Sequence, residues 1–173
     1  MRYRKTAVAE SSPYITAEGY LRLQQEQSAL WERRREVVKH LAAAAAEGDR
    51  SENAEYIYRK KELRELDRRI RYLQKRLPEL KIVRDRPIDN KQVFFGAWVM
   101  LENVGGQTVT YRIVGVDESD QHRNEISVDS PLARTLLKKK VDDEISVQTP
   151  KKTDRYVIVA VSYAPPLTVV VSG

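Results

Sequence analysis

Two long segments with helical periodicity, joined by only a few residues, constrain this chain more than any other feature. In the first segment one set of residues recurs every seventh position and a second set falls between them; the sets are Leu23, Leu30, Val37 and Ala44, and Gln27, Arg34 and Leu41. In the second, apolar side chains follow in steps of three and four after one step of seven, at Tyr56, Leu63, Leu66, Ile70, Leu73, Leu77 and Leu80. Neither helix can bury such a row alone, and the connection at 48–51 is short. The sequence therefore predicts an antiparallel coiled-coil hairpin over residues 14–86, with arms of about 45 Å.

The spacing of apolar residues changes to two after a linker at residues 87–90. Alternation predicts strands at 93–101, 108–116, 125–129, 145–149 and 156–163, and Ser130-Pro131 opens a short helix through residue 139. We expect a small α+β domain with a mainly antiparallel sheet over residues 91–164. The flanking residues 1–13 and 165–173 are expected to be tails, the first basic and disordered. The fold class is thus α+β with two domains.

Composition limits the classes of protein that are possible. The chain has no cysteine, which excludes disulfides and thiolate metal sites. No apolar run approaches the roughly 20 residues that cross a bilayer, and no apolar signal core follows the basic N-terminus. We expect a soluble, cytoplasmic protein.

The excess of positive charge falls within the second helix and its flanks. Residues 50–86 hold 13 Lys and Arg against 7 Asp and Glu, which accounts for the whole net charge of +6. Opposite the apolar row, a basic stripe of about 20 Å runs along the helix, made of Lys61, Arg64, Arg68, Arg71 and Lys75. A stripe of one sign predicts contact with a single RNA strand, although a solvated helix face is the alternative. Tyr72 beside the stripe either stacks on a base or packs on the seam.

Asp49 and Glu52, in the connection between the helices, have two interpretations. Their spacing of three fits a capping box at the start of the second helix, where acidic residues are favoured. It also places two carboxylates on one side of the first turn, where they can supply oxygen ligands to Mg²⁺. Because Mg²⁺ prefers six ligands, this pair would bind it only by completing a site that a partner holds.

Three motifs resemble the Gre family of transcript cleavage factors. They are GDRSENAEY at 48–56, FFGAWV at 94–99 and ISVDSPLAR at 126–134. The resemblance extends from about residue 15 to 163, and residues 80–83 and the basic second helix resemble the GreB branch more than the GreA branch. The chain departs from the family at Asp142-Asp143, where members commonly have Gly-Asp.

The resemblance implies a function that no single motif would give. The C-terminal domain would be FKBP-like and would bind the rim of the secondary channel of bacterial RNA polymerase through Ser130, Pro131 and Leu132. The hairpin would enter that channel, and Asp49 and Glu52 would help to hold a second Mg²⁺ shared with the polymerase. The factor would thereby activate cleavage of nascent RNA in backtracked complexes without being an enzyme itself.

Two other functions compete with this one. A non-catalytic protein could occupy the same channel and modulate or inhibit transcription, and the acidic pair at 49 and 52 argues for the cleavage-competent form. A peptidyl-prolyl isomerase would follow from the C-terminal fold alone, but a fold does not carry a function.

Overall fold

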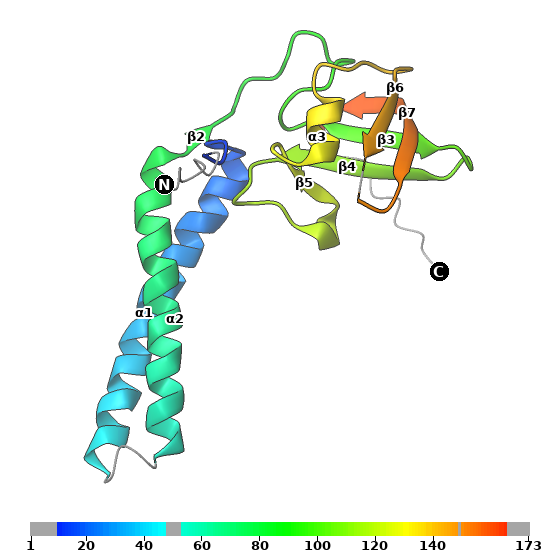
Figure 1. The fold of residues 1–173 in the computed structure, drawn as a ribbon. Coiled ribbons are helices and arrows are strands. Elements are labelled where there is room, and N and C mark those ends of the chain that lie inside the picture. Colours follow the sequence, from blue (N-terminus) through cyan, green and yellow to red (C-terminus); the bar gives the residue numbers. More distant parts are fainter. Residues whose placement is uncertain (1–9, 48–52, 149, 166–173) are drawn as a thin grey trace, which may run out of the picture. The chain divides into compact units, whose positions relative to one another are not determined.

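The computed structural model describes residues 10–47, 53–148 and 150–165. The chain forms two compact units, one of residues 18–80 and one that combines the residues before 18 with those from 81 onward. Figure 1 shows two long helices in the first unit and a twisted sheet with one short helix in the second. These are the two domains and the α+β class that the sequence predicts.

The first unit is an antiparallel pair of helices, α1 (Ala17–Ala46) and α2 (Ala54–Arg76), followed by the 3₁₀ turn η1 (Leu77–Glu79). Their lengths correspond to about 45 Å and 35 Å. Contacts between the helices fix the antiparallel register: Arg69 bonds to Glu26 near one end, and the Asn53 amide donates to the Ala44 carbonyl at 3.1 Å near the other.

The apolar seam of the hairpin lies where the periodicity places it. On α1 the buried seam residues are Leu23, Val37 and Ala44; on α2 and η1 they are Ile70, Leu73 and Leu77. The remaining predicted apolar positions, Leu30, Leu41, Tyr56, Leu63, Leu66 and Leu80, are partly buried. The predicted position of the seam is therefore confirmed. The seam is narrow, because only one row of side chains from each helix is shielded from water.

The second unit is built on a five-stranded sheet in the order β5-β4-β3-β7-β6. Its strands are β3 (Trp98–Asn103), β4 (Thr108–Val114), β5 (Glu125–Ser127), β6 (Glu144–Gln148) and β7 (Thr153–Ser162). Most neighbours are antiparallel, but β5 runs parallel to β4, with Ile113 opposite Ile126. The connection between these two parallel strands includes the turn η2 (Gln121–Arg123) and returns the chain toward the end of the sheet where β4 begins, a crossover that local periodicity does not reveal.

One face of the sheet carries the core of this unit, with helix α3 (Pro131–Leu136) packed on it. Val99, Leu101, Ile113 and Ile158 from the strands and Leu136 from α3 are all 0% exposed. Alternate residues of each strand point away from this core, as a period of two requires. The α3 helix is shorter than predicted and ends at residue 136 rather than 139.

Residues 10–16 belong to the second unit. For residues 10–13, the part of the predicted disordered tail 1–13 that the structure describes, the prediction is therefore wrong. The Ser12 amide donates to Asp129 at 2.8 Å, and its hydroxyl donates to the other oxygen of that carboxylate. A short parallel pair follows, β1 (Tyr14–Ile15) against β2 (Lys81–Ile82). The segments that lead into α1 and away from η1 are thus paired with each other, and the unit boundaries differ from the predicted limits of 14 and 86.

Glu118 holds the same N-terminal segment from within the second unit. Its carboxylate is buried and accepts from the Thr16 amide at 2.8 Å and from the Thr16 hydroxyl at 2.5 Å. The amide of Gly115 donates to it as well, at 2.8 Å. A side chain at position 115 would meet the Tyr14 carbonyl, since an added Cβ would lie 2.2 Å from that oxygen. We name this set of contacts the Glu118 anchor.

Candidate nucleic-acid interface

Asp49 and Glu52, the predicted acidic pair, lie outside the described residues. The residues on either side nevertheless correct one expectation: α2 begins at Ala54, with Asn53 as its N-cap. The Asn53 side-chain oxygen accepts from the Tyr56 amide at 3.1 Å. The N-cap that the structure describes is therefore Asn53, where the sequence pattern had suggested Asp49. The placement of Asp49 and Glu52 themselves stays a prediction. Asn53 and Asp49 are both favourable caps, so composition alone could not choose between them.

The five residues of the predicted basic stripe are all exposed side chains on α2; they are Lys61, Arg64, Arg68, Arg71 and Lys75. Among the residues that the structure describes, no carboxylate lies within ion-pair distance of any of them. Arg71 donates from Nε to the carbonyl of Asp67 at 3.2 Å, which leaves its charge uncompensated. These cations are therefore available to an anionic ligand.

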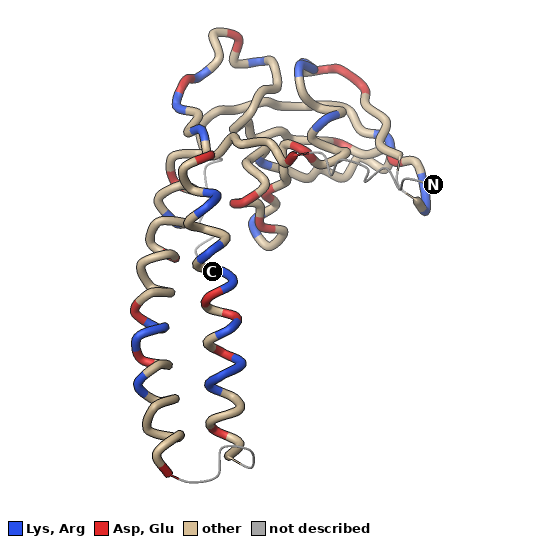
Figure 2. The backbone as a smooth tube through the Cα atoms, turned by 60° about the vertical axis from the view of Figure 1, so that its left-hand side comes forward, with Lys and Arg blue, Asp and Glu red and all other residues tan. Residues whose placement is uncertain are grey.

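Other arginines of the hairpin are paired, and this distinguishes them from the stripe. Arg33 contacts Glu62 at 2.7 Å, Arg34 contacts Asp67 at 2.7 Å and Arg69 contacts Glu26 at 2.6 Å, each across the two helices. Figure 2 shows Lys and Arg interspersed with Asp and Glu along α2, whereas the last turns of α1 carry no charge until an acidic residue beside the grey connection. The basic residues thus divide into a structural set and an unpaired set.

Glu62 shows how the structural set is coupled. Its side chain is 18% exposed, and burial acts to raise its pKa. Hydrogen bonds from Arg33 and Arg59 outweigh this effect and lower the pKa below its ordinary value. Because the ionised form of Glu62 is favoured in the folded state, its contacts with Arg33 and Arg59 stabilise the fold at pH values above the ordinary carboxylate pKa. This stabilisation is lost as the pH falls through the lowered pKa of Glu62.

The predicted polymerase-contacting residues lie at the start of α3. Ser130 is the N-cap, and its hydroxyl accepts from the Ala133 amide at 3.2 Å. Pro131 is exposed, whereas Leu132 is partly buried against the core of the unit. Ser130 and Leu132 therefore have structural roles, and Pro131 offers the free surface. The preceding Asp129 is held by Ser12, a long-range contact that sequence reasoning missed.

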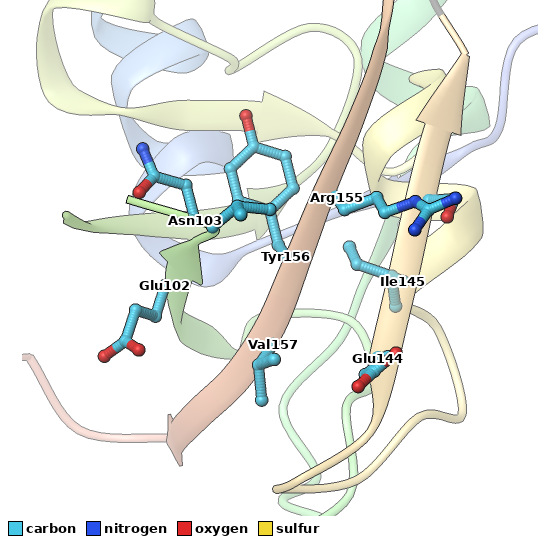
Figure 3. A pocket seen from close by; sticks show the side chains of 9 residues that line it. Glu102, Asn103, Glu144, Ile145, Arg155, Tyr156 and Val157 are labelled. Atoms are coloured by element: carbon cyan, nitrogen blue, oxygen red, sulfur yellow. The ribbon is translucent and has the colours of Figure 1, made fainter. Parts of the chain in front are cut away.

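A hollow of about 440 Å³ is lined by residues of β3, β6 and β7. Figure 3 shows Glu102 and Asn103 of β3 on one side of β7 and Glu144 and Ile145 of β6 on the other. Its charged lining residues are of both signs, with Arg155 facing the solvent. Over residues 10–47, 53–148 and 150–165, no group of three or more His, Cys, Asp or Glu could hold a metal ion.

In the described part of the chain, no helix combines the length and the apolar composition that crossing a bilayer requires.

Comparison with protein families matches almost the whole chain. The model described as "Transcription elongation factor, N-terminal" matches residues 13–82, and that described as "Transcription elongation factor, GreA/GreB, C-term" matches residues 88–163. The chain is 57% identical over 165 residues to the transcription elongation factor GreB of Xanthomonas axonopodis pv. citri, covering 94% of this chain and 98% of that one. It is 52% identical to GreB of Pseudomonas aeruginosa, covering 95% and 98% respectively.

Among solved structures, the chain is similar to Gfh1 of Thermus aquaticus at 26% identity. The alignment covers 88% of this chain and 99% of that chain, with a TM-score of 0.41.

Proposed function

The chain belongs to the GreA/GreB family of transcription elongation factors, and we propose that it acts by stimulating cleavage of nascent RNA in backtracked RNA polymerase. In this proposal the hairpin enters the polymerase through its secondary channel, in the cytoplasm. The bond that breaks is an RNA phosphodiester, and the polymerase carries out the hydrolysis. The chain is an activator and not a nuclease.

The observation that carries the proposal is the unpaired basic stripe on a helix that follows the acidic connection directly. Lys61, its first residue, is seven residues beyond the start of α2, or about 10 Å along the axis. Lys75, its last residue, is about 20 Å further on. A single RNA strand bound along this stripe would lie parallel to the hairpin and reach the connection that holds Asp49 and Glu52. This arrangement suits a protein that handles a displaced RNA end.

Asp49 and Glu52 would act as the functional pair in this connection. Carboxylate oxygens are the ligands that Mg²⁺ prefers, and a second Mg²⁺ shared with the polymerase would supply charge stabilisation during hydrolysis. The chain's own contribution is to bring the two carboxylates to that ion. Since Asn53 caps α2, neither acid is needed to cap that helix, which removes the principal structural explanation for the pair.

The polymerase-binding surface is proposed to lie at the N-terminus of α3. Pro131 is exposed there, on a turn that Ser130 and the Ser12–Asp129 contacts fix. We expect this surface to bind polymerase regardless of the acids at 49 and 52. Binding and cleavage are therefore separable functions of the two units.

The test uses Asp49→Ala and Glu52→Ala, each added to a stalled, backtracked elongation complex with Mg²⁺. Each variant should bind the polymerase as the parent does, while the rate of RNA shortening falls by at least about a hundredfold, or roughly 2.7 kcal/mol of activation free energy.

The matched control is Glu47→Gln, which changes an exposed acid directly after α1. It should leave cleavage within a factor of two or so. If both alanine variants cleaved at the parental rate, the acidic pair would have no part in the reaction. If the parent bound and slowed the polymerase without shortening RNA, the chain would be a non-catalytic channel binder instead.

A further inference from the structure

The side of the hairpin that carries the basic stripe also holds a groove with an exposed aromatic ring. The groove has a volume of about 420 Å³, and its lining residues are Trp31, Arg34, Asp67, Ile70, Arg71 and Gln74. Trp31 comes from α1 and is 39% exposed, so part of its ring is accessible to a ligand. Arg71 belongs to both the groove and the stripe, so the two features are continuous.

Trp31 forms a cation–π contact with a neighbouring arginine of the same helix. The guanidinium of Arg34 lies 5.8 Å from the centre of the ring, and Arg34 is itself fixed by its 2.7 Å pair with Asp67. This cation–π contact favours the observed orientation of the indole. The ring therefore presents a prearranged apolar surface next to an unpaired cation.

The remaining groove residues provide polar recognition around this ring. Gln74 is exposed and forms no side-chain hydrogen bond with any residue that the structure describes. Its amide offers both a donor and an acceptor, which is what the edge of a nucleic-acid base requires. Arg71, three positions earlier on α2, supplies a positive charge for a phosphate.

We propose that this groove binds one base of a single RNA strand, with the base stacked on Trp31 while its backbone follows the basic stripe. The inference rests on the proposed function and makes it more specific, because it adds a base-binding position to a contact that otherwise depends on charge. Aromatic stacking tolerates any base, so the position would hold RNA without selecting a sequence. A polymerase segment is the other conceivable occupant, but the unpaired cations favour an anionic strand.

Two tryptophans in the chain make the proposal directly measurable. Trp98 lies in the second unit, with Arg112 4.0 Å above its ring, so Trp98→Phe leaves Trp31 as the sole indole. In this full-length variant at low salt, a short single-stranded RNA should quench the Trp31 fluorescence on binding. An abasic oligomer of the same length should bind through its phosphates without equal quenching.

Affinity supplies the second measurement. Trp31→Leu should weaken binding of the RNA oligomer by at least about fivefold, whereas Trp31→Phe, which keeps an aromatic face, should weaken it much less. The salt dependence should stay the same in both, because no phosphate contact is removed. Unchanged helical circular dichroism would show that the leucine variant is folded.

The outcomes separate this inference from the proposed function. Equal binding by the leucine variant, or no quenching of Trp31, overturns the base-binding groove even if the parent cleaves RNA normally. Loss of polymerase binding in Trp31→Leu, with RNA binding unchanged, assigns the groove to a protein contact and also overturns it. Absence of cleavage by the parent chain would contradict the proposed function, while the quenching result would still decide the groove.

Discussion

The two units of this protein use charged side chains in opposite ways. In the second unit the carboxylates of Glu118 and Asp129 are turned inward and bound by backbone amides and hydroxyls. In the described part of the hairpin, the ion pairs between the helices are partly exposed to solvent and lie along a seam with few fully buried residues. One unit draws its stability from its interior, and the other leaves much of its surface free for a ligand.

The difference has a physical basis in shape. A sheet covered by a helix encloses side chains completely, whereas a pair of helices can shield only one row from each partner. Ion pairs between the helices supplement the narrow seam of the hairpin, and the cations of the basic stripe take no part in them. The hairpin can thus change its exposed cations at little cost in stability, which suits a surface selected for binding.

The largest expected effect concerns the buried carboxylate of Glu118. Glu118→Ala removes the acceptor of two backbone amides and a hydroxyl, and should lower the free energy of unfolding of the second unit by about 2–4 kcal/mol. Urea denaturation followed through Trp98 fluorescence in a Trp31→Phe background measures this. Glu102→Ala, at an exposed position of β3, is the control and should change stability by less than about 0.5 kcal/mol. Equal losses of stability in the two variants would show that the buried Glu118 carboxylate does not stabilise the second unit.

The next prediction compares unpaired with paired arginines of the hairpin. Arg64→Ala with Arg68→Ala should weaken binding to single-stranded RNA and reduce the slope of log affinity against log salt by about 1.4, since two phosphate contacts are lost. The melting temperature should not change. The result that opposes this interpretation is an identical salt slope, which would make the stripe a solvated face.

The matched pair is Arg33→Ala with Arg69→Ala, in which two contacts between the helices are removed. This variant should lower the melting temperature by about 2–5 °C and leave the salt slope unchanged. If both double variants affected RNA binding alike, the division of the hairpin into a structural and a binding set would fail.

The smallest predicted effect is a gain in stability at Asp142. Its backbone has a φ of 73°, in the left-handed region that glycine adopts most easily. Asp142→Gly should therefore raise the free energy of unfolding by about 0.5–1 kcal/mol. Asp143→Gly is the control and should be destabilising, because the Asp143 carboxylate accepts from the Lys140 amide at 2.7 Å. A loss of stability in Asp142→Gly would contradict the strain argument.

Local periodicity was sufficient to predict the helical seam, the exposure of the basic stripe and most strand limits to within about three residues. The first strand was placed too early, at 93 instead of Trp98, because the apolar spacing continues through the preceding turns. Periodicity failed where contacts join residues far apart in the chain. Ser12 and Asp129, or Thr16 and Glu118, are more than a hundred positions apart and have no shared pattern. The parallel direction of β5 was missed for the same reason, as alternation describes the faces of a strand but not its direction.

The candidate site was predictable in part. A step of three and four identifies which residues share a face of α2, and so it placed the stripe. Trp31 was overlooked because it lies on the other helix, where its spacing fits neither seam set, and only the packing of α1 on α2 brings it beside Arg71. An isolated tryptophan outside an apolar row is the signal that could have identified it.

The central claim is that this chain causes RNA polymerase to cut its own transcript. The most direct measurement adds the full-length protein to a backtracked complex whose RNA is labelled at its 3′ end, with Mg²⁺ and without nucleotides. The account predicts release of short labelled fragments, followed by renewed extension of the remaining RNA once nucleotides are supplied. Protein that binds the complex yet releases no labelled fragment over background would contradict it.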